Sequence, residues 1–189
     1  IYYDLGIFFY EKKKFLDAID NYKKALALEP DFATARNNLG VVYMALKEWD
    51  QAIETLMPIT EDYLYATPHY PHFLIGQAYF HKKDFRHAVE HFEASLDLQP
   101  KFPFAAHWLG KTYLAKGQTE KAVSALEKAV DMSPAAVFHL DLARAYSRAG
   151  KLTKARQAIG KAQSLATDSA LAEEIQKERE KLKKKDCQL

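Results

Sequence analysis

The stretch "NNLGVVYMALKEWDQAIETL", residues Asn37–Leu56, decides the fold. Apolar and small side chains recur at spacings of three and four residues on both sides of the polar segment "KEWD", a pattern typical of two amphipathic helices joined by a tight turn. Gly40 lies in the first helix, Ala52 follows twelve residues later in the second, and Leu56 lies four residues beyond. The stretch therefore predicts a pair of antiparallel helices.

The glycine, the alanine and the bulky residue of this pair return along the chain at a nearly constant period. The glycine series is Gly6, Gly40, Gly76 and Gly110, at separations of 34, 36 and 34 residues, and Ala143 continues it. The alanine series is Ala18, Ala52, Ala88, Ala122 and Ala155, and the bulky series is Tyr22, Leu56, Phe92, Leu126 and Ile159. Five copies in register predict a repeat architecture.

The period and its signature positions resemble the tetratricopeptide repeat over residues 1–167. The resemblance implies an all-α fold, a right-handed superhelix of five helix-turn-helix repeats. The repeats are 1–32, 33–68, 69–102, 103–135 and 136–167. We expect each glycine to face the alanine of the second helix, because two small residues let the helix backbones approach closely.

Proline and polar residues mark the ends of the predicted helices. Pro30, Pro100 and Pro134 follow three of the second helices, where a proline stops a helix. Residues 168–189 leave the repeat register and predict a C-terminal capping helix and tail, with an Asp or Ser cap. Its apolar residues, Leu171, Ile175 and Leu182, would contact the last repeat, and its charged residues would face water.

The segment "MPITEDYLYATPHYP", Met57–Pro71, makes the second repeat longer than the others. Pro58 predicts that the helix kinks or ends near Met57 and resumes in "TEDYLY" at a different angle. The residues before Pro68 and Pro71 should be extended. We expect this insert to carry Tyr63, Tyr65 and Tyr70 to the rim of the superhelix.

The first helices of a superhelix of this kind line its concave wall, which is where a partner segment would bind. Aromatic side chains would contribute buried area and the paired amides would bind a peptide backbone. The predicted groove residues are Asn37, Asn38, Val41, Tyr70, Phe73, Gln77, Phe80, Phe104, His107, Trp108, Lys111 and Arg144. An alternative remains open, in which some of them contact the neighbouring repeat. A groove that captures a terminal carboxylate is disfavoured, because Ile7, Tyr70 and Leu74 stand where basic or polar residues are needed.

Composition excludes several classes of function. A net charge of +2, from 27 basic and 25 acidic residues, leaves no electrostatic basis for nucleic-acid binding. No apolar run is long enough to span a bilayer, so we expect no direct membrane insertion. The chain starts in helical phase, which suggests that residues precede Ile1. The single cysteine, Cys187, cannot form an internal disulfide.

No motif indicates catalysis, a cofactor or a metal. The chain has no phosphate loop, nucleophile elbow or paired-cysteine site, so we expect no enzymatic activity and no cofactor. Asp84, His87 and His91 have the spacing of one helix face, but we interpret them as exposed helix residues rather than a zinc site. His107 would contact a peptide, since the sequence shows no carboxylate partner for it.

A closer resemblance follows from "NNLGVVYMALKEWDQAIE", the loop "DYLYATP" and the next repeat, over about residues 36–130. These segments resemble type IV pilus biogenesis lipoproteins, the pilotins of the secretin. The resemblance implies a periplasmic protein, tethered to the outer membrane by a lipid anchor upstream of Ile1, that binds a secretin subunit and assists assembly of the pore. The alternative is a general adaptor or co-chaperone scaffold in another compartment.

Overall fold

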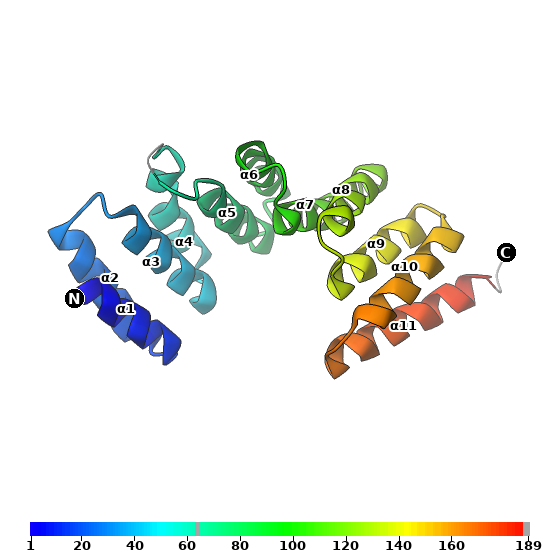
Figure 1. Cartoon of the computed structure of the whole chain (residues 1–189). Coiled ribbons are helices and arrows are strands. Elements are labelled where there is room, and N and C mark those ends of the chain that lie inside the picture. The colour runs from blue at the N-terminus through cyan, green and yellow to red at the C-terminus, as the bar shows by residue number, and fades with distance from the viewer. Residues whose placement is uncertain (63–64, 187–189) are drawn as a thin grey trace. The chain divides into compact units, whose positions relative to one another are not determined.

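The computed structural model describes residues 1–62 and 65–186, so the predictions for Tyr63 and Cys187 lie outside the described residues. The chain divides into two compact units, Ile1–Pro100 and Lys101–Leu189. Unit 1 contains α1 (Tyr2–Glu11), α2 (Phe15–Leu28), α3 (Ala33–Leu46), α4 (Trp49–Leu56), the 3₁₀ helix η1 (Met57–Thr60), α5 (His69–His81) and α6 (Phe85–Leu98) (Figure 1). Unit 2 contains α7 (Pro103–Ala115), α8 (Thr119–Met132), α9 (Ala136–Arg148), α10 (Leu152–Leu165) and α11 (Ser169–Asp186). The described residues form helices and turns without a strand, which confirms the all-α prediction.

Successive helices pack in pairs, α1 with α2, α3 with α4, α5 with α6, α7 with α8 and α9 with α10. Figure 1 shows the two helices of each pair lying side by side. Three second helices, α2, α6 and α8, end two residues before Pro30, Pro100 and Pro134. The closing prolines therefore stand just past the helix ends, as predicted.

The glycine series permits close packing, and the nearest contacts are with the bulky residue of the second helix. A Cβ atom added to Gly76 would lie 2.7 Å from Cε1 of Phe92, and one added to Gly40 would lie 2.5 Å from Cδ2 of Leu56. Gly6 and Gly110 meet Tyr22 and Leu126 in the same way. The glycine therefore makes room first for the bulky residue sixteen positions later. At Gly110 the expected alanine is also close, since the backbone oxygen of Ala122 lies 3.3 Å from the added Cβ. The alanines are themselves fully buried, because the second helix also packs tightly one turn earlier.

The turn between the two helices of each repeat contains one residue with a left-handed backbone, seven positions after the glycine series. These residues are Lys13, Lys47, Lys83, Gly117 and Gly150, with φ angles of 57°, 61°, 63°, 74° and 73°. Glycine adopts this conformation at little cost, whereas lysine does so with steric strain. Three of the five turns therefore keep a locally unfavourable residue because the packed helices on either side require the conformation.

The insert interrupts the second repeat at the predicted place. Helix α4 ends at Leu56 after eight residues, and Pro58 lies in η1. Glu61 and Asp62 are not helical, so the expectation that a helix resumes in this segment is wrong for the residues described. Tyr70 is also not extended, because it lies in the first turn of α5, where the fixed φ of the following Pro71 suits a helix.

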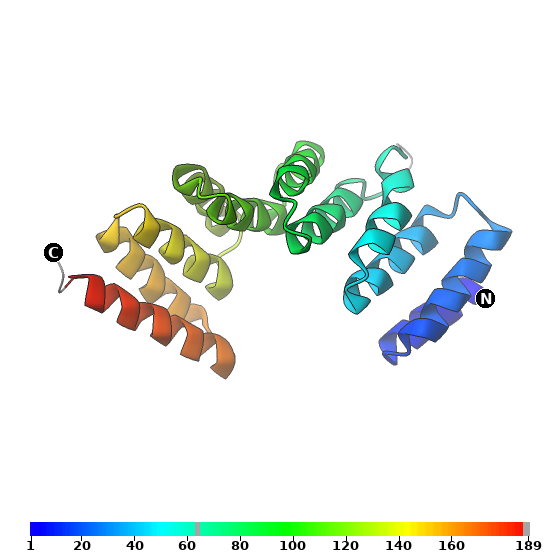
Figure 2. The same ribbon diagram turned by 180° about the vertical axis from the view of Figure 1, so that it is seen from behind.

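Helix α11 caps unit 2 as predicted. Asp168 supplies the cap, since its carboxylate accepts hydrogen bonds from the backbone N–H groups of Ala170 and Leu171. Ile175 and Leu182 are buried in one cluster with α9 and α10. Figure 2 shows α9, α10 and α11 lying side by side in this unit. No helix in residues 1–62 and 65–186 has the length and apolar content needed to cross a bilayer.

Candidate functional site

Groove residues of the first two repeats line a pocket of about 260 Å³ in unit 1. Its walls come from Ile7, Tyr10 and Glu11 of α1 and from Asn38 and Val41 of α3, and the ring of Tyr22 from α2 also lines it. We call the cavity that these six residues line the α1–α3 pocket. The sequence prediction placed Asn38 and Val41 on the groove face, and the structure brings them together here.

Polar groups of the α1–α3 pocket are held in place by hydrogen bonds. The Asn38 side-chain amide donates to the hydroxyl of Tyr3 at 3.2 Å. Burial raises the pKa of the Tyr22 phenol to about 12, against the opposing effect of its hydrogen bond with Asn38. Tyr22 therefore stays protonated at neutral pH, and the pocket presents a neutral phenol, an amide and the carboxylate of Glu11 around apolar walls.

Asn37 does not lie on the open face with Asn38. Its side chain is 7% exposed, and its Oδ1 atom has no hydrogen-bond partner among the described residues. A buried acceptor left without a partner costs about 1 to 3 kcal/mol. The structure therefore places only one of the paired amides where it could contact a peptide.

The aromatic residues of α5 differ in how accessible they are. Tyr70 is half-buried, with its ring centroid 5.9 Å from that of Phe73. Phe73 is 7% exposed and lies 6.1 Å from the ring of Phe92 in α6. Phe73 therefore belongs to the interior of the third repeat itself, whereas the alternative interpretation was contact with the neighbouring repeat. Gln77 and Phe80 are half-buried on the same helix.

In unit 2 the most accessible groove residue is Phe104 of α7, which is 53% exposed. It lies edge-on to Phe138 of α9 at 5.8 Å. Trp108 is half-buried, and the ammonium group of Lys111 lies 4.1 Å from the centroid of its ring. A cation at this distance from an aromatic face is attracted to it. Unit 2 thus presents an aromatic face with one positive charge fixed on it.

His107 is buried in unit 2 rather than open to a peptide, and it has a carboxylate partner. Its Nε2 atom lies 2.8 Å from Oδ2 of Asp141, and an N–H of Arg144 donates to Oδ1 of the same carboxylate at 2.8 Å. Burial alone would raise the pKa of Asp141, but these two contacts together hold it below its ordinary value. Asp141 is therefore a buried anion shared by one histidine and one arginine.

Arg144 is also bound by the last helix of the chain. Its guanidinium donates to Glu174 at 2.7 Å and lies 3.7 Å from Glu178, both in α11. Three carboxylates therefore surround this arginine, which was predicted to contact a partner. In the described structure its charge is neutralised within the chain.

The histidines of the third repeat are arranged differently from the set singled out in the sequence. Asp84 caps α6 by accepting a hydrogen bond from the backbone N–H of His87, and its second oxygen lies 2.6 Å from His87 Nδ1. His91 instead faces His72 of α5, with the two Nδ1 atoms 3.1 Å apart. The sequence spacing missed this pair because its members come from different helices.

Four family profiles match parts of the chain. One is described as "TPR repeat" and covers residues 6–47, and three described as "Tetratricopeptide repeat" cover 69–102, 91–124 and 109–170. Residues 48–68, which include α4 and η1, are outside all four. None of the matches indicates a catalytic domain.

Two further comparisons find similar proteins. Anaphase-promoting complex subunit 6 of Arabidopsis thaliana is 28% identical over 185 residues, which cover 90% of this chain and 33% of that protein. This chain spans about a third of the length of the curated relatives it matches.

Among solved structures, MamA is 27% identical with a TM-score of 0.76, and the match covers 86% of this chain and 88% of that one. PilW, described as a widely conserved type IV pilus biogenesis factor, is 21% identical with a TM-score of 0.81, over 92% of this chain and 80% of that one. The likeness to PilW shows a shared fold.

Proposed function

Because this chain belongs to the tetratricopeptide repeat family, we propose that it is a non-enzymatic scaffold that binds a segment of a protein partner on the groove face of its first helices. The observation that carries the proposal is the α1–α3 pocket, a cavity of about 260 Å³. Its walls combine apolar side chains with a few fixed polar groups, which is the usual composition of a binding site.

The size of the α1–α3 pocket limits what it contributes. One apolar side chain fits, and burying a side chain the size of leucine contributes about 1.5 to 3 kcal/mol. Micromolar affinity corresponds to about 8 kcal/mol, so a partner needs additional contacts along the groove face. Tyr70 and Phe80 in unit 1 are accessible enough to supply some of them, and Phe104 and Trp108 offer a second aromatic face in unit 2.

The test uses peptides selected from a displayed random library against the whole chain. Val41→Glu places a charge in the pocket wall and should weaken binding of the selected peptides by at least about ten-fold, since burying an unpaired charge is strongly unfavourable. Leu16→Glu makes the same kind of change on α2 at a side chain that is 78% exposed and outside the pocket, and should leave affinity unchanged. Equal affinity of the Val41→Glu variant, with an unchanged helical circular dichroism spectrum, would contradict the proposal.

We further propose that the partner is a subunit of a type IV pilus secretin and that the protein acts in the periplasm at the outer membrane. The support is the resemblance in "NNLG" at Asn37–Gly40 and in "DYLYATP" at residues 62–68, together with a fold like that of PilW. Under this proposal a lipid anchor upstream of Ile1 would tether the protein.

Cell fractionation tests this second proposal directly. The protein should appear in the outer-membrane fraction, and a strain lacking it should contain fewer detergent-resistant secretin multimers. Restoring the wild type should recover the multimers, and restoring the Val41→Glu variant should not. A cytosolic location would instead favour a general adaptor or co-chaperone scaffold.

A further inference from the structure

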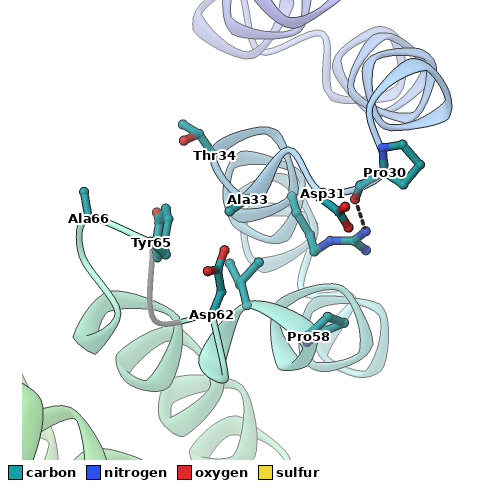
Figure 3. A pocket seen from close by; sticks show the side chains of 10 residues that line it. Pro30, Asp31, Ala33, Thr34, Pro58, Asp62, Tyr65 and Ala66 are labelled. Atoms are coloured by element: carbon teal, nitrogen blue, oxygen red, sulfur yellow. Dashed lines mark hydrogen bonds between the residues drawn. The ribbon is translucent and has the colours of Figure 1, made fainter.

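A second and larger cavity lies in unit 1, with a different lining from that of the α1–α3 pocket. Its volume is about 700 Å³, within the usual range of binding pockets, and none of the twelve predicted groove residues lines it. Figure 3 shows Pro30 and Asp31, from the loop between α2 and α3, at one end and Tyr65 and Ala66 at the other, with Asp62 between them. We call this cavity the insert pocket.

The insert in the second repeat builds half of this cavity. Pro58, Ile59, Asp62, Tyr65 and Ala66 all follow the end of α4, and they face the start of α3 across the pocket. The segment lies in residues 48–68, which no repeat profile matches. The pocket is therefore a feature that this chain adds to the shared repeat, rather than a part of the repeat itself.

Charge in the insert pocket favours a cation. Two carboxylates, Asp31 and Asp62, line it together with one guanidinium, that of Arg36. Arg36 is held against the α2–α3 loop, because its Nη2 donates to the carbonyl oxygen of Pro30 at 2.7 Å. The net charge of these three lining residues is thus negative. An anionic ligand would be repelled and a cationic ligand attracted.

The remaining lining suits a flat cation. Tyr65 contributes an aromatic ring, and Pro30 and Pro58 contribute rigid apolar surfaces. A guanidinium group is planar, weakly hydrated and stacks on such surfaces, whereas an ammonium group is compact and strongly hydrated. The lining therefore favours arginine over lysine.

We infer that the insert pocket binds an arginine side chain presented by an extended segment of a protein partner, at a site separate from the groove face. Asp31 and Asp62 contact the guanidinium and Tyr65 packs against its plane. This gives the insert a function that the repeat pattern does not require of it.

The experiment titrates the whole ¹⁵N-labelled chain with acetyl-Gly-Arg-Gly-amide and follows backbone amide shifts. Saturable shifts are expected at Thr34, Tyr65 and Ala66. The same peptide with citrulline, which keeps the shape of arginine without its charge, should bind more weakly, and the lysine peptide should fall between the two.

Variants locate the site. Asp31→Asn and Asp62→Asn should each raise the dissociation constant by about two- to five-fold, the usual effect of removing one partly exposed ion pair. Asp97→Asn, an equally conservative change at an exposed position of α6, should leave it unchanged. Equal binding of the citrulline peptide would overturn the inference. So would saturable shifts at Tyr10 and Asn38 in place of the insert pocket, although that result would support binding on the groove face.

Discussion

The Nε2 atom of His107 lies 2.8 Å from Oδ2 of Asp141, and both side chains are buried in unit 2. The two residues stand 34 positions apart, so the contact joins the first helices of adjacent repeats. Because Arg144 binds the other oxygen of the same carboxylate, the buried charge of Asp141 is compensated from two sides.

Asp141→Ala should destabilise unit 2 by about 3 kcal/mol, because it leaves His107 and Arg144 without the anion between them. The measurement is urea unfolding followed by the fluorescence of Trp108 in a Trp49→Phe background. Glu120→Ala breaks the exposed ion pair with Lys151 and should cost less than about 1 kcal/mol. Since the partners are coupled, the double variant His107→Ala, Asp141→Ala should cost less than the sum of the single variants. Additive costs would contradict the coupling.

Gly76→Ala should destabilise unit 1 by about 1 to 3 kcal/mol, because the added methyl group overlaps the buried ring of Phe92. Urea unfolding monitored by Trp49 in a Trp108→Phe background measures the loss. The fifth repeat carries Ala143 and Ile159 at the corresponding positions, buried in one cluster. The double variant Gly76→Ala, Phe92→Ile should therefore lose less stability than the sum of the losses in the two single variants. If Gly76→Ala alone is neutral, the close contact does not limit packing.

Gly117→Ala and Gly160→Ala should change stability in opposite directions. Neither glycine has an atom within 4 Å of an added Cβ, so the two sites differ mainly in backbone conformation. Gly117 has a φ of 74°, and alanine there should cost about 1 kcal/mol. Gly160 lies inside α10, where alanine should stabilise the helix by up to about 1 kcal/mol. The midpoints of thermal unfolding should shift accordingly, and a shift of the same sign for both would contradict this explanation.

Unit 1 should lose stability as the pH falls from 7.5 to 5. Burial, together with the nearby His72 and His87, lowers the pKa of His91 from 6.5 to about 4. The unfolded chain therefore binds a proton below about pH 6.5 that the folded chain does not, which favours unfolding by about 2 kcal/mol at pH 5. His91→Gln should remove most of this dependence in urea titrations monitored by Trp49. Burial also lowers the pKa of His69 and His72, so a smaller dependence of the same sign should remain. His139→Gln, in unit 2, should leave the dependence unchanged, and a dependence of undiminished size in His91→Gln would rule out His91 as its main source.

The helices and their pairing could be predicted from the sequence because each repeat restates the same spacing. Gly40, Ala52 and Leu56 illustrate this, since their spacing recurs in every copy and predicts the helix pair. The spacing did not show that the nearest neighbour of Gly40 is Leu56. The end of α4 was equally predictable, because the effect of Pro58 on a helix is local. These features depend on near neighbours in the chain.

Which residues of a first helix stay accessible could not be predicted in the same way. Phe73 and His107 occupy groove positions by count, yet both are buried, because the neighbouring helices cover that side of the helix. The angle between packed helices decides such coverage, and the period alone does not determine it. The sequence contains one signal for the partner of His107, which is the acidic residue Asp141 one repeat further along. It contains no signal for the contact between His72 and His91.

The short helix α4 has a mechanical consequence. With eight residues, against fourteen in α2, it holds about four internal backbone hydrogen bonds where α2 holds about ten. Stretching unit 1 from its ends would therefore extend the second repeat before its neighbours. The second repeat adjoins the insert pocket, so we expect a pulling force on the chain to disrupt that pocket before the neighbouring repeats unfold.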